Sequence, residues 1–158
     1  LHTAVKDGEV LQRPGVPVLV SGSLIESAAV LETVETCGGL VVADDLCTGL
    51  RAFGQASSAG NPPFDRLMDR HFNRVHCASR VRAEDRLAEI RNLLERSGAR
   101  GVLFVVQKFC TPHLSDYPHL SAELKKNGIP VLLAEMDENW QTRGQFETRL
   151  EAFFEMLR

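Results

Sequence analysis

Two cysteines follow apolar runs that are typical of buried strands, and a thiol in such a position can react with a substrate or bind a metal ion. Residues 40–43 lead to Cys47, and residues 101–109 lead to Cys110. Continuous apolar runs of this kind predict parallel strands that helices cover on both faces. Ligands of open α/β sheets gather outside the carboxyl ends of the strands. The two thiols are therefore expected to converge at one edge of a sheet.

A polar segment ends a further apolar run, residues 16–20, and precedes a helical pattern. Ser21, Gly22 and Ser23 form this segment. Backbone N–H groups between a strand and a helix favour an anion or a carbonyl oxygen. The alternative is a helix cap combined with a tight turn. No glycine-rich dinucleotide or P-loop motif is present in the sequence, which argues against a tightly held dinucleotide.

The four cysteines lack the short repeated spacing of a zinc site or a disulfide framework. Cys47 and Cys110 are either metal-ligating thiols or inert, buried ones, and Cys77 is left undecided between these alternatives. Cys37 lies in a helix-ending turn and is expected to pack as a small apolar residue. Thiolates select zinc, copper(I) or iron–sulfur clusters, and a cluster takes more than two cysteines, so further ligands would have to come from elsewhere.

Other ionisable residues lie in the same predicted loops. Asp44 and Asp45 precede Cys47, where they could hold a cation or, alternatively, cap a helix and solvate the sheet edge. A phosphorylated receiver domain is disfavoured, because the third strand would end at Cys77 rather than at an aspartate. His113 follows Cys110 and is a candidate proton donor, with a surface polar group as the alternative.

The periodicity of apolar residues predicts alternating strands and helices. A long loop is expected over residues 51–63, and Pro112 is expected to delay the helix that follows Cys110. This order predicts an α/β, Rossmann-like or flavodoxin-like three-layer domain with a parallel sheet. The expected strands are residues 16–20, 40–43, 74–77 (weak), 101–109 and 129–134, and the expected helices are residues 25–34, 64–72, 83–96, 116–126 and 143–157.

Length and composition indicate one ordinary domain. The chain has 158 residues, with 18 Lys and Arg against 21 Asp and Glu, so no basic patch for nucleic acid is apparent. The sequence shows neither an apolar run long enough to span a membrane nor a signal peptide, which predicts a cytoplasmic protein without a membrane partner. The chain starts at Leu1 without methionine, so a fragment or processed product is expected.

The motifs together resemble the carboxy-terminal half of the 2-hydroxyacyl-CoA dehydratase and benzoyl-CoA reductase family, to which the 2-hydroxyglutaryl-CoA dehydratase D-component belongs. They follow the order of that family and cover nearly the whole chain. The motifs are residues 20–23 (VSGS), 42–49 (VADDLCTG), 108–113 (KFCTPH), 116–118 (DYP) and 144–153 (GQFETRLEAF).

The resemblance implies that residues 1–158 form one Rossmann-like lobe, the carboxy-terminal domain of a longer iron–sulfur subunit. In the family, cysteines from two lobes hold an oxygen-sensitive [4Fe–4S] cluster. An ATP-hydrolysing activator injects one electron, and the thioester of the acyl-CoA becomes a ketyl radical that expels its hydroxyl group. The reductases keep the electrons and reduce an aromatic ring instead. A homologous second subunit is the expected partner.

Residue by residue, the resemblance makes Cys110 the best cluster ligand, because it occupies the Lys-Phe-Cys position. Cys47 matches another characteristic cysteine that either ligates iron or lines the pocket, and Cys77 is a third possibility. Ser21 to Ser23 would donate hydrogen bonds to the substrate thioester. The amino-terminal half of the family is missing here, so a lone lobe is expected to bind a cluster weakly or not at all and to lack activity.

Three hypotheses follow. The first is the lobe of a lyase or reductase subunit that acts on an acyl-CoA. The second is a non-catalytic electron-transfer or scaffold subunit of the same ancestry, which would lack an open coordination site and acyl-CoA binding. The third is a flavodoxin-like binding domain with inert cysteines, in which Cys110→Ser would change nothing except a small loss of stability.

Overall fold

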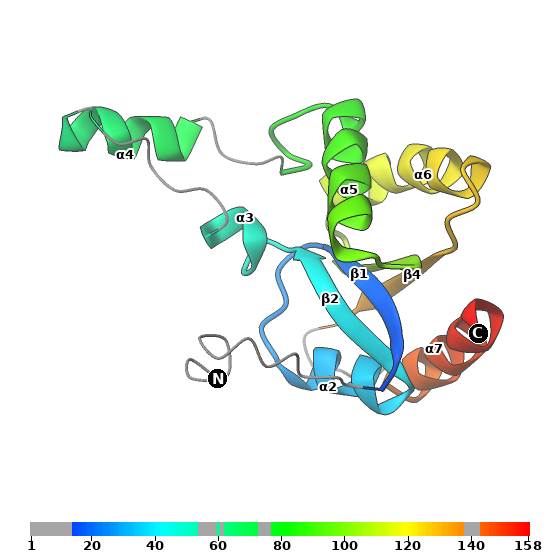
Figure 1. Ribbon diagram of the computed structural model, residues 1–158. Helices are drawn as coiled ribbons and strands as arrows, with labels where there is room; N and C mark the ends of the chain where they lie inside the picture. The colour runs from blue at the N-terminus through cyan, green and yellow to red at the C-terminus, as the bar shows by residue number, and fades with distance from the viewer. Residues whose placement is uncertain (1–13, 54–59, 61, 73–76, 138–142) are drawn as a thin grey trace, which may run out of the picture.

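The computed structural model describes residues 14–53, 60, 62–72, 77–137 and 143–158, and these residues form alternating strands and helices (Figure 1). The strands are β1 (Val16–Gly22), β2 (Gly39–Asp45), β3 (Gly101–Gln107) and β4 (Val131–Met136). The helices are α2 (Ala29–Thr36), α3 (Leu50–Phe53), α4 (Pro63–Phe72), α5 (Ala83–Ser97), α6 (Thr111–Lys126) and α7 (Arg143–Leu157).

The four strands form one parallel sheet in the order β2-β1-β3-β4. β1 and β3 lie at its centre and are almost entirely buried, as the apolar runs predict. In the register of the sheet, Ser21 pairs with Asp45 on one side, and Gly22 pairs with Val105 on the other. The predicted α/β fold with a parallel sheet is confirmed, and the strand order is the one seen in flavodoxin-like domains.

Helices cover both faces of the sheet and create two apolar cores (Figure 1). On one face, residues such as Val34 of α2 and Phe153 of α7 pack against Val18 and Val20 of β1. On the other face, residues such as Ile90 of α5 and Leu120 of α6 pack against alternate residues of β1 and β3. This division follows from the period of two in a strand, which directs successive side chains to opposite faces.

The helices after β1 and β3 cover opposite faces, which makes the gap between these strand ends a topological switch point. α2 follows β1 onto one face, and α6 follows β3 onto the other. Backbone loops diverge at such a point and leave room for a ligand at the carboxyl ends of the strands. The loops that carry Ser23 and Cys110 both begin there.

The start of α6 differs from the prediction. This helix begins at Thr111, directly after Cys110, and not at residue 116. Pro112 lies in its first turn, where the missing N–H would have no partner within the helix anyway, so the proline favours the helix start that it was expected to delay. Cys110 therefore occupies the cap position of α6.

Two further expectations are corrected or lie outside the described residues. Ser21 and Gly22 belong to β1, and α2 starts only at Ala29, so no helix begins directly after Ser23. The weak strand at residues 74–77 falls largely outside the described residues, as does much of the loop over residues 51–63, in which α3 and α4 are the described helices. None of the described helices is both long and apolar enough to cross a lipid bilayer.

Candidate functional site

Cys47 and Cys110 follow the carboxyl ends of β2 and β3, and Cys77 precedes α5. All three are free and half-buried. Burial raises the pKa of the Cys47 thiol, the Arg51 guanidinium opposes this rise, and the nearby Cys77 and Cys110 add to it. The charges of Cys77 and Cys110 thus act on the Cys47 thiol, and Cys47 and Cys110 both lie beyond the carboxyl ends of parallel strands.

Cys37 lies apart from these three thiols. It caps the carboxyl end of α2, just before β2 begins, and packs against the core between the sheet and α7. Burial raises the pKa of its thiol, and the carboxylates of Glu151 and Glu147 raise it further. The predicted packing role of Cys37 is confirmed.

Arg51 is a buried guanidinium beside Cys47. Its Nε donates a hydrogen bond to Asp45 Oδ1 at 2.7 Å, and its Nη2 donates to the carbonyl oxygen of Gly22 at 2.8 Å. Its Nη1 donates to Cys47 Sγ at 3.3 Å. The side chain is only 5% exposed. Arg51 thus joins the ends of β1 and β2 to a candidate ligand.

The acidic partner of Arg51 is Asp45, which is buried at the end of β2. Its Oδ2 accepts a hydrogen bond from Ser21 Oγ at 2.7 Å, and Arg86 Nη2 lies 3.8 Å from the same oxygen. Arg86 in turn donates to Asp116 Oδ2 at 3.0 Å. Two guanidiniums and two carboxylates therefore compensate one another. We refer to Asp45, Arg51, Arg86, His113 and Asp116 as the buried charge network.

His113 lies between the two arginines of this network. Its Nε2 is 3.4 Å from Arg51 Nη1, and its Nδ1 is 3.3 Å from Arg86 Nη2. The pKa of His113 is lowered from 6.5 to about 4, mainly by burial and then by the charges of Arg86 and Arg51, while Asp45 opposes the shift. The ring is therefore neutral at pH 7, and because a neutral imidazole has one acceptor nitrogen, only one of these contacts is a conventional hydrogen bond.

Asp44 and Asp45 have separate roles, although they are adjacent. Asp44 Oδ1 accepts hydrogen bonds from the N–H groups of Leu50 at 2.7 Å and Leu46 at 3.3 Å, so it caps the turn that leads into α3. A Cβ at Gly49 would collide with the Asp44 carboxylate. The capping alternative is thus confirmed for Asp44, whereas Asp45 belongs to the buried charge network.

The segment predicted to bind a substrate already makes contacts within the sheet. The Ser21 hydroxyl donates to Asp45, and Ser23 Oγ accepts a hydrogen bond from the Gln107 N–H at 2.8 Å. The Ser23 N–H donates to the Val105 carbonyl at 3.1 Å. A Cβ at Gly22 would collide with that carbonyl oxygen, so only glycine allows this close approach of β1 to β3.

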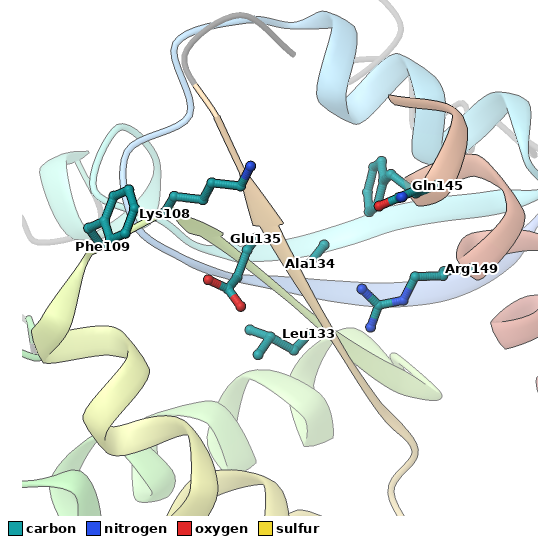
Figure 2. A pocket seen from close by; sticks show the side chains of 8 residues that line it. Lys108, Phe109, Leu133, Ala134, Glu135, Gln145 and Arg149 are labelled. Carbon is teal, nitrogen blue, oxygen red and sulfur yellow. The ribbon is translucent and has the colours of Figure 1, made fainter. Parts of the chain in front are cut away.

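A hollow of about 580 Å³ lies beside β4 at the edge of the sheet (Figure 2). Lys108 and Phe109 line one end, and Gln145 and Arg149 of α7 line the other. A similar hollow of about 590 Å³ lies at the ends of β1, β3 and β4, beside Leu24 and Asp137. The lining residues of both hollows include Lys108 and Phe109 but not Cys47, Cys77 or Cys110.

The family with the description 2-hydroxyglutaryl-CoA dehydratase, D-component, matches residues 2–157, which is nearly the whole chain. The chain belongs to the 2-hydroxyglutaryl-CoA dehydratase D-component family. The recognition made from the sequence motifs is thereby confirmed.

Curated relatives carry the names of dehydratase subunits. The (R)-phenyllactyl-CoA dehydratase beta subunit of Clostridium sporogenes is 29% identical over 90% of this chain and 38% of its own length. The (R)-2-hydroxyglutaryl-CoA dehydratase subunit beta of Acidaminococcus fermentans is 31% identical over 99% of this chain and 39% of its own length. The lactoyl-CoA dehydratase subunit beta of Anaerotignum propionicum is 27% identical over 99% of this chain and 42% of its own length. The chain thus spans about two fifths of the length of these relatives.

The cysteines of this chain are of the kind that ligates an iron–sulfur cluster, but they do not complete a ligand set. Cys47, Cys77 and Cys110 supply soft sulfur donors, and the Arg51 guanidinium contacts Cys47. Among the described residues, however, no three His, Cys, Asp or Glu side chains are grouped closely enough to hold a metal ion. The described residues therefore offer sulfur donors of the right kind without a complete set of ligands.

The sequence patterns did not predict the buried charge network as a unit. Arg51 lay in a predicted surface loop, and Arg86 lay among the polar residues of a predicted helix. Charged side chains are rarely buried unless they are paired. From the sequence alone, each arginine is therefore expected to be exposed to solvent. The available signal was Asp45, an acid at the end of a predicted strand, because an acid that is buried there needs a partner.

Proposed function

We propose that this chain is a lobe of a 2-hydroxyacyl-CoA dehydratase subunit and that Cys110 contributes a ligand to a [4Fe–4S] cluster, with Cys47 and Cys77 as further ligand candidates. The observation that carries the proposal is that the free, half-buried Cys110 and Cys47 follow the carboxyl ends of β3 and β2 in a chain of this family. Such a cluster, when bound, supplies the single low-potential electron that the elimination of water from a 2-hydroxyacyl-CoA requires.

Other elements hold the candidate ligands in position. Cys110 is the cap residue of α6, so the helix fixes the backbone that carries this thiol. Arg51 contacts Cys47 and balances negative charge there. A shared site also needs a second lobe and, for turnover, a partner subunit, an ATP-dependent activator and the acyl-CoA. Three relatives with three different acyl groups in their names support the class of substrate but not one particular acyl group.

One observation favours a second candidate, an electron-transfer or scaffold subunit of the same family. The hydroxyl groups of Ser21 and Ser23, predicted to bind the thioester, contact Asp45 and the Gln107 N–H instead. A subunit of this kind would hold the cluster without an open coordination site and would not bind the acyl-CoA. The role of His113 as proton donor stays a prediction. Its pKa of about 4 does not favour this role, because the ring is neutral at pH 7.

The test is iron and acid-labile sulfide content, with an EPR spectrum, on the full-length natural polypeptide that contains this chain, purified without oxygen. Cys110→Ser is expected to reduce the iron content, whereas Cys37→Ser is the matched control, because Cys37 is equally free but packs at another edge of the sheet. Equal iron in both variants would contradict the assignment of Cys110. No iron in the wild type would leave a domain with inert thiols.

Binding of 2-hydroxyglutaryl-CoA, phenyllactyl-CoA and lactoyl-CoA to the iron-loaded polypeptide separates the two candidates. A change of the EPR spectrum on addition of one of them would support the substrate-binding subunit. An iron-loaded protein that binds none of the three would support the electron-transfer subunit.

A further inference from the structure

Arg51 has more fixed contacts than an arginine needs in order to neutralise one aspartate. Two of its nitrogens, Nε and Nη2, donate to Asp45 and to the Gly22 carbonyl at 2.7 and 2.8 Å. These two contacts hold the plane of the guanidinium, because its donors diverge in a rigid fork. The third nitrogen, Nη1, is thereby directed at Cys47 Sγ and His113.

A guanidinium that is held in this way acts on sulfur in two respects. It orients the thiol through a hydrogen bond, and its fixed positive charge favours the deprotonated sulfur that a metal ion requires. Partners of this kind outside the ligand set orient ligands and tune the metal. For iron–sulfur sites, hydrogen bonds to the sulfurs are among the factors that determine the reduction potential.

We propose that Arg51 is a positioning residue that holds Cys47 at the cluster and raises the reduction potential of that cluster. The inference rests on the proposed function and adds a role for a residue that no motif indicated. The reduced form of a cluster carries one more negative charge than the oxidised form, so the Arg51 guanidinium stabilises the reduced form more.

Arg86 provides a matched comparison within the same network. It is buried like Arg51, its Nη2 lies 3.8 Å from the Asp45 carboxylate, and it contacts His113 from the opposite side. Its short contact is to Asp116 at 3.0 Å, and no hydrogen bond from Arg86 to a cysteine is present in the described part of the chain, although its charge lowers the pKa of the Cys77 thiol. Loss of Arg86 therefore removes a buried charge without removing a hydrogen bond to sulfur.

The experiment compares wild type, Arg51→Gln, Arg51→Lys and Arg86→Gln in the full-length natural polypeptide, purified without oxygen. Iron content, thermal unfolding and the midpoint potential from an EPR-monitored redox titration are measured for each. We expect Arg51→Gln to bind a cluster with a more negative potential than the wild type. Arg86→Gln is expected to change the potential less than Arg51→Gln, because the charge of Arg86 acts on Cys77 without a hydrogen bond to sulfur, and to destabilise the fold.

Arg51→Lys keeps the charge but has a single nitrogen, which cannot donate to Asp45, Gly22 and Cys47 from separate positions. It is expected to lower the potential as well, by less than Arg51→Gln. If Arg51→Gln does not fold, Arg51→Lys decides the outcome.

Different results separate this inference from the proposed function. Iron in the wild type with an unchanged potential in both Arg51 variants would overturn the role of Arg51 and leave the cluster assignment intact. An equal change in Arg86→Gln would also overturn it, since a general effect of buried charge would then be responsible. A wild type without iron would overturn both proposals.

Discussion

Phe109 has an unusual backbone conformation immediately before Cys110. Its φ of 66° lies in the left-handed region, and its side chain is 91% exposed. A residue with a Cβ is destabilised by about 1–2 kcal/mol in that region. Because the Phe109 ring is exposed, its packing offsets little of this cost. The strained residue turns the chain from β3 toward α6, which places Cys110 at the cap of the helix.

Phe109→Gly is expected to raise the free energy of unfolding by about 0.5 kcal/mol, because glycine removes the strain but gains more entropy in the unfolded chain. Gly98→Ala is the matched reverse change, at a φ of 68° where a Cβ would meet no other atom. It is expected to cost about 1 kcal/mol. Urea unfolding of both variants measures these changes, and a large loss of stability in Phe109→Gly would show that the exposed ring has a stabilising contact.

α4 differs from the other long helices because none of its described residues is buried. Phe64, Leu67 and Phe72 are all more than half exposed. In Figure 1 the helix lies away from both helical layers of the sheet. α5 has the opposite character, since Ile90 is completely buried in the core between the sheet and α6. The two helices should therefore contribute very differently to stability.

Leu67→Glu is expected to change the free energy of unfolding of the domain by no more than about 0.5 kcal/mol, as is usual for exposed positions. Ile90→Ala is expected to destabilise it by about 2–5 kcal/mol through loss of buried apolar surface and formation of a cavity. Chemical denaturation of the two variants tests this difference. A comparable loss in Leu67→Glu would show that α4 packs on the domain in solution.

The buried charge network connects most layers of the molecule. Asp45 belongs to the sheet, Arg51 to α3, Arg86 to α5, and His113 and Asp116 to α6. The folded molecule therefore holds the His113 ring between two arginines, and the unfolded chain does not. Any proton that His113 accepts must be accommodated by the whole arrangement, which makes the stability of the domain sensitive to mild acid.

The free energy of unfolding is expected to fall as the pH decreases from about 6.5 to 4. The folded pKa of His113 is lower than the unfolded value of 6.5, so the unfolded chain binds more protons in that window. For a folded pKa of about 4, the free energy of unfolding falls by at most about 3 kcal/mol. Urea unfolding between pH 7 and 4.5 measures the slope, and His113→Gln should flatten it. Equal slopes in both proteins would contradict this interpretation.

The sequence by itself determined the strand and helix layers of this protein, because continuous apolar runs and helical spacing report burial directly. The central runs of β1 and β3 and the extent of α7 were predicted in this way. The sequence also identified the family, since its motifs retain their order along the chain. Local rules failed at Pro112, where a residue that breaks helices in their interior occupies a first turn instead.

Only the tertiary structure decided which polar residues meet. Arg51 and Arg86 are 35 positions apart in the chain, yet both face Asp45 and His113 inside the fold. The same structure directs Ser21 toward Asp45 and not toward an open site. The physical reason is that hydrophobic burial is a property of each residue and its spacing, whereas the partners of a buried charge depend on how separate elements pack around it.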